Sequence, residues 1–337
     1  MNLKIGCSGF PAGKEEYFNK FRIVELQDTF IELPGPAAAE KLRAEAPDDF
    51  EFTMKAWQVI THEAGFSGYD RMSKPIEENR KPGAGSFKPS KTVREAWKRT
   101  EEVADILGAK VVVFDCPDLF LPRKENFENM EGFFRQIKNK SRRYAWIPPK
   151  TWTAEEIKDI SSAAGIVHCV DPFDNAALAG DIGYFRLRDK EGPGGRHTGL
   201  DMKKLRDFCE KRSSELGGAP LYVFFNNRPK LNDAMRFEWI AANTGPLKGI
   251  GTEFLSKLCH EIEAAEEDEK VQLLSREAEK IVNLILHTEY ARIDIEIESQ
   301  KLKKMCAELF PDKEYLYDMI YGQRFRRLWE QFREDGE

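Results

Sequence analysis

The sequence lacks any apolar run near the roughly 20 residues that a membrane-spanning helix needs. Its start, MNLKIGCSGF, also lacks the long apolar core of a signal peptide. Histidine is scarce, with 5 residues, and the 6 cysteines show no Cys-x-x-Cys spacing, which disfavours a disulfide framework. We therefore expect a cytoplasmic protein with reduced thiols and no membrane association.

Positive charge is not in excess either. Charged residues of both signs make up 33% of the chain, and the formal net charge is -6. This balance excludes a generally basic coat for nucleic acid, so any anion binding is expected to be local. The 337 residues, 41% of them apolar, are enough for at least one full-size hydrophobic core.

Short apolar runs alternate along the chain with segments of helical length. The runs that we expect to be strands are 3–8, 22–27, 50–56, 110–116, 143–148, 165–171, 184–189 and 221–227. Helices are expected at 92–107, 125–138, 153–163 and 201–215. Alternation of strands and helices predicts a parallel sheet. Eight such units over about 250 residues favour a closed (β/α)8 barrel, the TIM barrel, over an open doubly wound sheet.

Nearly every predicted strand ends in polar residues. In a TIM barrel these ends meet at one rim, where active sites lie. The polar residues are Ser8, Glu25, Gln27, Lys55, Asp115, Asp171, Arg186, Arg188, Asn226 and Asn227. The candidate catalytic residues are Glu25, Lys55 and Asp171, with Glu25 or Asp171 as a general base or as a ligand of an optional divalent metal.

The stretch YFRLRDKEGPGGRH, residues 184–197, concentrates positive charge at one strand end. Because side chains alternate along a strand, Arg186 and Arg188 are expected side by side on one face, and Arg196 and His197 follow in the loop. Guanidinium groups suit bidentate recognition of phosphate, and the glycines let the backbone approach a ligand. The predicted anion-binding residues are Arg186, Arg188, Arg196, His197, Asn226, His62 and Asp115.

Two adjacent guanidinium groups repel each other unless acids or an anion compensate their charge. One source of compensation is an exogenous anion, such as the phosphate of a small molecule or of single-stranded nucleic acid. The alternative is an internal ion-pair network with Glu25, Asp115 or Asp171. Both interpretations stay open on the sequence alone.

A set of motifs runs through residues 1–255: IGCSGF, VELQDTF, FEFTMKAWQVITH, VVVFDCP, HCVDPF, YFRLRDKEGPGGR and LYVFFNNRPKLNDAMRFEWI. In type and order they resemble the YecE-like proteins of domain-of-unknown-function family 72 (DUF72), which fold as TIM barrels. The resemblance implies a polar pocket at the top of the barrel and no settled reaction. The pocket positions that it implies are Glu25, Thr29, Lys55, His62, Asp171, Arg186 and Asn226.

The chain departs from the pattern of that family at several rim positions. Relatives usually carry a Glu and an Arg on strand five, where this chain has Ile147 and Pro149. They usually read Arg-x-His-Gly on strand seven, where this chain reads Arg-Leu-Arg-Asp over 186–189. Asp115 stands where a glutamine is common. The departures favour a specialised paralogue or a non-catalytic binder.

Metal chemistry gains little support from the sequence. Cys7, Cys116 and Cys169 lie near three strand ends, where thiolates could in principle hold zinc or an iron–sulfur cluster. Alternation turns Cys116 away from Asp115, however, and buried inert cysteine is the commoner state. The cofactor is therefore left undetermined, with a divalent metal as an option.

The long segment 61–91 after the third strand interleaves lysines with Phe66, Tyr69 and Phe87. A loop at this place can cover the mouth of the barrel, where cations and stacking faces suit a nucleotide or single-stranded nucleic acid. A plain surface excursion is the alternative.

Residues 262–337 are expected to form a helical extension of a barrel domain of residues 1–261. Apolar residues in heptad register predict a long helix, and ARIDIEIES, which alternates like a strand, predicts a break near Tyr290. A second helix is expected after Pro311, with an apolar side formed by Phe325, Leu328, Trp329 and Phe332. The helices would pack on the barrel or on a second copy, giving a homo-oligomer, or would dock a nucleic acid or protein.

Three hypotheses of function follow. The first is an enzyme that acts on a phosphate-containing substrate, a nucleotide or a nucleic acid, with Arg186 and Arg188 as the anion clamp and Lys55 as a further cation. The second is a nucleic-acid-binding protein without chemistry. The third is a catalytically inactive partner protein whose helical extension mediates assembly.

Overall fold

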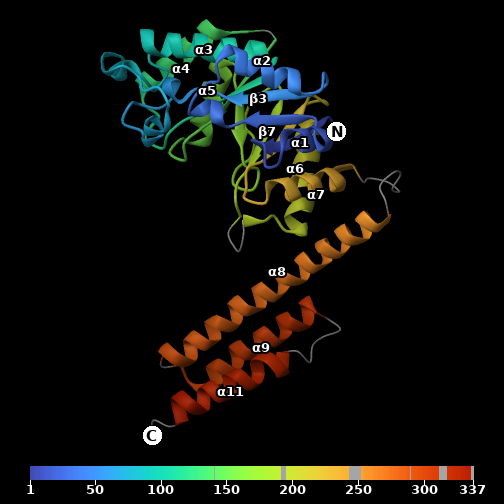
Figure 1. Ribbon diagram of the computed structural model, residues 1–337. Coiled ribbons are helices and arrows are strands. Elements are labelled where there is room, and N and C mark those ends of the chain that lie inside the picture. The colour runs from blue at the N-terminus through green and yellow to red at the C-terminus, as the bar shows by residue number, and fades with distance from the viewer. Residues whose placement is uncertain (140, 191–194, 243–251, 289, 311–316, 335–337) are drawn as a thin grey trace. The chain divides into compact units, whose positions relative to one another are not determined.

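The computed structural model describes residues 1–139, 141–190, 195–242, 252–288, 290–310 and 317–334 (Figure 1). The chain divides into two compact units. Unit 1 comprises Met1–His197 and Asp201–Leu247, and unit 2 comprises Thr198–Leu200 and Lys248–Glu337. Among the helices of the described ranges, none is both long and apolar enough to cross a membrane.

Unit 1 is built on a closed barrel in which every strand pairs in parallel with its neighbours and β1 also pairs with β8. The strands are β1 (Leu3–Ser8), β2 (Ile23–Leu26), β3 (Glu51–Lys55), β4 (Val111–Asp115), β5 (Arg143–Ile147), β6 (Val167–Val170), β7 (Gly183–Leu187) and β8 (Leu221–Phe225). The prediction of a TIM barrel is confirmed.

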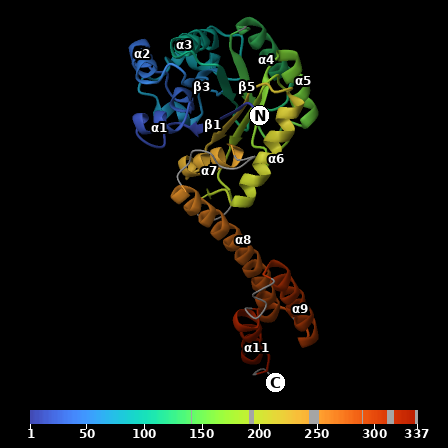
Figure 2. The ribbon, with the colours of Figure 1, turned by 90° about the vertical axis from the view of Figure 1, so that its right-hand side faces the viewer.

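Helices follow most strands and surround the barrel (Figure 2). They are α1 (Lys14–Lys20), α2 (Pro36–Glu45), α3 (Lys91–Leu107), α4 (Lys124–Ile137), α5 (Ala154–Ala164), α6 (Gly199–Glu215) and α7 (Lys230–Ala242). Local chemistry sets their ends. Helix α3 begins where Ser90 accepts the N–H of Val93 and ends at Gly108, which adopts the left-handed conformation that glycine favours.

The interior of the barrel is apolar below its carboxyl end. Because side chains alternate along each strand, one set points inward and the other packs under the helices. The inward cluster comprises Ile23, Val111, Val113, Ala145, Val167, Cys169, Ile182, Tyr184, Tyr222 and Phe224. The inward-facing residues at the carboxyl ends of the strands come directly after these positions. The packing of the core therefore determines which side chains meet at the rim.

The segment 61–91 packs against the barrel with most of its aromatic residues inside. Phe87 is 1% exposed and lies among Phe114, Phe120, Phe133 and Phe134, with ring centroids 5.3–5.8 Å apart. Burial of large apolar rings is strongly favourable, and Tyr69 is buried as well. The hypothesis of a lid with several stacking faces is therefore wrong for these two residues.

A tight turn inserts Phe87 into that cluster. Gly85, Ser86 and Phe87 all have positive φ, at 82°, 53° and 52°, and their N–H groups donate to the carbonyls of residues 59, 61 and 60. A Cβ on Gly85 would lie 2.5 Å from the backbone nitrogen of Glu63, so only glycine fits there. Two of these carbonyls, those of residues 59 and 60, belong to the short 3-10 helix η2 (Gln58–Ile60), which directly precedes the segment.

Unit 2 is a bundle of helices. Its elements are α8 (Thr252–His287), α9 (Arg292–Leu309), η6 (Asp318–Gly322), α11 (Gln323–Trp329) and η7 (Glu330–Glu334). The predicted break near Tyr290 lies between α8 and α9, but ARIDIEIES belongs to α9 and is not a strand. Residue 262 lies inside α8, so the boundary at 261/262 stays a prediction.

The core of unit 2 contains four of the five apolar residues that stand in heptad register, Leu274, Ile281, Ile295 and Leu302, and the fifth, Leu309, packs against it. Its buried members are Leu274, Ala278, Ile281, Val282, Ile285, Ile295, Leu302, Cys306, Tyr317, Tyr321 and Phe325. Leu309, Leu328 and Trp329 pack against it. Phe332, by contrast, is 56% exposed, so its predicted place on the apolar side is wrong.

Candidate active site

Glu25 of β2 is fully buried at the rim and accepts hydrogen bonds from four side chains. Ser8 Oγ and Arg186 Nε donate to its Oε1, at 2.8 and 2.9 Å. Gln27 Nε2 donates to the same oxygen, and the Tyr184 hydroxyl donates to Oε2 at 2.8 Å. Both carboxylate oxygens therefore have partners.

The charge of Glu25 is stabilised by its surroundings. Burial alone would raise the pKa of this carboxyl, but the charges of Arg186 and Lys55 and the hydrogen bonds from Arg186 and Tyr184 hold it below its usual value. A fully buried carboxylate whose two oxygens both accept hydrogen bonds has no oxygen left to take a proton from a substrate. Its surroundings favour a role in holding Arg186 rather than the general-base role that the sequence predicts.

Lys55 and Asp115, at the ends of β3 and β4, form a second ion pair, in which Lys55 Nζ donates to Asp115 Oδ2. Thr29 Oγ1 donates to the carbonyl of Lys55 at 2.8 Å and fixes the end of the strand. Burial raises the pKa of Asp115, but Lys55 outweighs this effect and lowers it. The Asp115 side chain is 28% exposed and its Oδ1 bonds no described residue, so it is the accessible carboxylate.

Arg186 joins the two pairs. Its Nη2 donates to Gln27 Oε1 at 2.8 Å, while its Nη1 makes no hydrogen bond to any residue in the described ranges. The Arg186 charge acts on both Glu25 and Asp115, and so does the charge of Lys55. We call Glu25, Lys55, Asp115 and Arg186 the rim quartet. It holds two acids and two bases that compensate one another.

Arg188 does not lie beside Arg186 on a strand, and this expectation is wrong. β7 ends at Leu187, and the backbone N–H of Arg188 donates to Asp171 Oδ2 at 2.9 Å. The chain leaves the strand there, so the alternation that would align the two arginines ends. The Arg188 side chain is half-exposed and its guanidinium pairs with Asp174.

Asp171 follows β6 and is half-buried. It accepts the backbone N–H groups of Arg188 and Phe173, the second at 3.1 Å from Oδ1. Burial raises the pKa of Asp171, although the two N–H groups and the Arg188 charge oppose the shift. Its pKa thus moves opposite to that of Asp115, and both of its oxygens are occupied by backbone N–H groups of the turn after β6.

His62 is buried near the Lys55–Asp115 pair. Its ring centroid lies 5.0 Å from that of Phe30 and 4.3 Å from that of Phe66, and its Nδ1 lies 2.8 Å from Thr61 Oγ1. Burial lowers the pKa of His62 to about 4 in spite of Asp115. The ring is therefore neutral near pH 7, and His62 adds no positive charge to an anion site.

Arg196 and His197 lie in a different hydrogen-bond network. The backbone N–H of His197 donates to Asp233 Oδ2 at 2.9 Å, and its Nε2 lies 3.1 Å from the carbonyl of Arg188. Arg196 lies 4.0 Å from Asp233. These contacts fix the chain against α7, so the prediction that both residues bind the anion finds no support in their contacts.

Asn226 has its backbone N–H on the carbonyl of Leu187, at 2.8 Å, and its half-buried side chain bonds none of the described residues. Sequence reasoning missed Tyr184 and Lys230. The alternation that places Arg186 at the rim also places Tyr184 on the same face, one step deeper. No periodic pattern indicates Lys230, whose Nζ donates to the carbonyl of Ser8 from the start of α7.

The cysteines do not converge. Cys116 Sγ accepts from Trp146 Nε1 at 3.2 Å, Cys7 Sγ lies 3.5 Å from the carbonyl of Lys230, and Cys169 is part of the inward cluster. Within the described ranges, no three His, Cys, Asp or Glu side chains are grouped closely enough to hold a metal ion.

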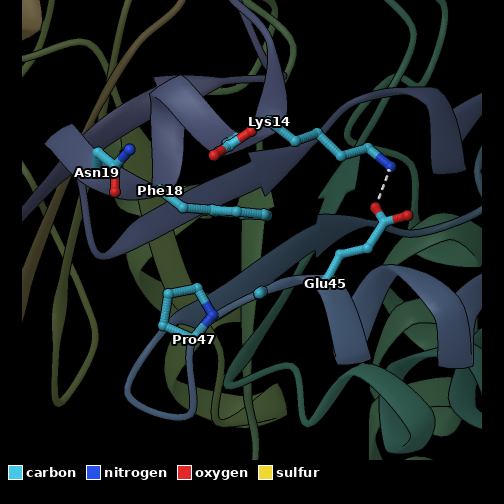
Figure 3. A pocket seen from close by; sticks show the side chains of 7 residues that line it. Lys14, Phe18, Asn19, Glu45 and Pro47 are labelled. Carbon is cyan, nitrogen blue, oxygen red and sulfur yellow. Dashed lines mark hydrogen bonds and ion pairs between the residues drawn. The ribbon is translucent and has the colours of Figure 1, made fainter.

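A groove of about 580 Å³ lies between α1 and the end of α2. The ion pair of Lys14 Nζ and Glu45 Oε2, 2.8 Å apart, spans one side of it, and Phe18 and Pro47 line it as well (Figure 3). None of the rim residues lines this groove, so it is separate from the candidate active site.

The barrel and the charged side chains at its carboxyl end define a TIM-barrel protein with a polar site at the usual place for this fold. The chain belongs to the DUF72 family, described as "Protein of unknown function DUF72", whose model matches residues 12–244. No curated protein matches the sequence.

Two solved structures show the same fold. A DUF72 family protein from Thermotoga maritima is 19% identical, with a TM-score of 0.52 over 71% of this chain and 99% of its own. A DUF72 family protein from Enterococcus faecalis is 13% identical, with a TM-score of 0.56 over 74% of this chain and 100% of its own. The departure predicted at Ile147 falls at the end of β5, where this side chain packs against the inward cluster.

Proposed function

We propose that the rim of the barrel is an active site that binds a phosphate-bearing substrate through Arg186 and Lys55, with Asp115 as the proton acceptor. The observation that carries the proposal is the state of Arg186. Its side chain is only 12% exposed and is fixed by Glu25 and Gln27, and its Nη1 remains as a donor to a ligand. A pre-positioned guanidinium is well suited to a phosphate oxygen.

Lys55 supplies a second donor beside the same site. The ammonium has three donors and uses one on Asp115 Oδ2. Asp115 Oδ1 remains to accept a hydrogen bond from a hydroxyl group or a water that loses its proton, as in phosphoester hydrolysis. The leaving group takes its proton from solvent water, because both oxygens of Asp171 already accept backbone N–H groups.

The competing interpretation is a purely structural ion-pair network, because the rim quartet compensates its own charges. The two interpretations differ in their response to ligands. A ligand that binds only the folded protein raises its melting temperature, whereas an internal network responds to no added phosphate. The non-catalytic nucleic-acid binder and the partner protein remain the alternatives if ligand binds without turnover, or not at all.

The test combines thermal shift against inorganic phosphate, sugar phosphates and nucleotides with phosphate release from the sugar phosphates and nucleotides. Arg186→Lys keeps a positive charge beside Glu25 but removes the planar guanidinium group and its paired N–H donors. It should therefore weaken phosphate binding by roughly 10- to 150-fold, the value of a charge-assisted hydrogen bond. Asp115→Asn should abolish turnover while binding persists. Arg188→Ala is the matched control and should change neither.

A wild type whose melting temperature ignores every phosphate in the panel would overturn the proposal. So would an Arg188→Ala variant as impaired as Arg186→Lys, because Arg188 pairs with Asp174 away from the rim quartet.

A further inference from the structure

An exposed aromatic ring lies near the rim quartet, connected to it through Phe30 and His62. Phe66 is 37% exposed and stacks at a tilt on His62, with the ring centroids 4.3 Å apart. Phe30 lies edge-on to His62 at 5.0 Å and is 6.3 Å from Phe66. We call Phe30, His62 and Phe66 the aromatic shelf.

Phe66 is held in place rather than free to rotate. His62 packs against it, and Gly68 comes so close that a Cβ there would lie 2.5 Å from Phe66 Cε1. The hydroxyl of Tyr69 donates to the carbonyl of His62 at 2.8 Å and ties the segment down. A fixed aromatic face loses little conformational entropy when a ligand covers it.

The aromatic shelf is continuous with the charged site. Lys55 Nζ lies 4.8 Å from the centroid of Phe30, over its ring. His62 interacts electrostatically with both Lys55 and Asp115, so the middle of the aromatic shelf lies near this ion pair. The span from Lys55 through Phe30 to Phe66 is on the scale of one nucleotide.

The size of the exposed face decides the kind of occupant. A phenylalanine that is 37% exposed offers about 70 Å², taking about 200 Å² for a whole ring side chain. A stable protein interface needs about 1,200–2,000 Å², so this face is far too small for one. One planar ring of a small ligand fits it.

We propose that the substrate carries an aromatic base as well as a phosphate, and that the base stacks on Phe66 while the phosphate binds Arg186 and Lys55. The substrate class is thus a nucleoside monophosphate or a related nucleotide. This inference rests on the proposed function, because it uses the same phosphate site. Stacking on an aromatic side chain tolerates any base, so the aromatic shelf sets the class and not the identity of the base.

Calorimetry with the full chain separates the two parts of the proposal. The probes are adenosine monophosphate, cytidine monophosphate, ribose 5-phosphate and adenosine. Wild type should bind either nucleotide more tightly than ribose 5-phosphate by roughly 5- to 150-fold, the value of one base stack. Phe66→Leu should abolish this ratio and leave ribose 5-phosphate binding unchanged. Phe66→Tyr should restore it, and Phe332→Leu, an exposed phenylalanine of unit 2, should not alter it.

The outcomes are distinguishable. Equal binding of nucleotides and ribose 5-phosphate overturns the stacking inference and leaves the phosphate site intact. Binding of adenosine as tight as that of its monophosphate, with none of ribose 5-phosphate, supports the aromatic shelf and overturns the phosphate site. Binding of none of the four overturns both.

Discussion

Replacing Arg186 by alanine should destabilise the barrel, because it leaves Glu25 buried without its main partner. Glu25 is fully buried and the Arg186 side chain is 12% exposed, so the pair lies almost out of water. Removing one member of such a pair costs about 3–5 kcal/mol of unfolding free energy. The sequence alone leaves the effect open: an anion site with two neighbouring, repelling arginines predicts unchanged or slightly raised stability, whereas an internal ion-pair network predicts a loss.

The hydrogen bonds that Glu25 keeps in Arg186→Ala decide where the loss of unfolding free energy falls within this range. Ser8, Gln27 and Tyr184 still donate to Glu25, and the charge of Lys55 still acts on it. Because the carboxylate keeps these partners, we expect a cost near the lower end, about 3 kcal/mol. Adding Glu25→Gln to Arg186→Ala removes the buried charge and should recover a good part of that loss.

The pH dependence gives a second signature. In the wild type the pKa of Glu25 is lowered in the folded state, so its contribution is present above its usual value of 4.5 and is lost as pH falls through the folded pKa. In Arg186→Ala the charge and hydrogen bond of Arg186 no longer oppose the effect of burial, so the pKa of Glu25 rises. The variant should therefore approach the wild type as pH falls toward 4.5, because Glu25 can take up a proton.

Urea unfolding followed by tryptophan fluorescence measures these effects in unit 1, which holds five of the six tryptophans, all but Trp329. A loss of less than about 1 kcal/mol in Arg186→Ala, or additive effects of the two substitutions, would refute the reasoning, because a buried pair must couple.

The remaining predictions concern His62 and Gly85. Burial lowers the pKa of His62 to about 4 from its usual 6.5, so the unfolded chain binds the extra proton between these values and stability falls as pH drops through them. His62→Gln should flatten that fall in unfolding experiments over a series of pH values, and an unchanged slope would contradict the assignment. Gly85→Ala should cost at least about 1–2 kcal/mol, since φ is 82° and the Cβ meets Glu63. Gly65→Ala, which meets no atom within 4 Å, should stay within about 0.5 kcal/mol.

The barrel was predictable because its strands are short apolar runs between amphipathic helices. VVVFD of β4 is an example, since its first four residues are buried. The expectation for ARIDIEIES was wrong because alternation is only a local signal. The capping contact of Asp294 with the N–H of Ala291, at 3.2 Å, and the burial of Ile295 in the core of unit 2 favour a helix there.

The rim was predictable only as far as strand alternation reaches. It places Glu25, Lys55, Asp115 and Arg186 together, but it does not say which acid meets which base, because Arg186 and Glu25 are 161 residues apart in the chain. Strand alternation also does not predict the position of Arg188, because the strand ends at Leu187 and the N–H of Arg188 donates to Asp171.

That single residue changes the chemistry of the site. With Arg188 directed to Asp174, the rim quartet has no excess of positive charge, so a phosphate cannot be held by uncompensated charge alone. Recognition must instead depend on the donors that the ion pairs hold in place, Arg186 Nη1 and the ammonium of Lys55. Fixed donors give geometric selectivity. They stay fixed because Glu25 and Asp115 hold them, and the same two acids lower the net charge of the site.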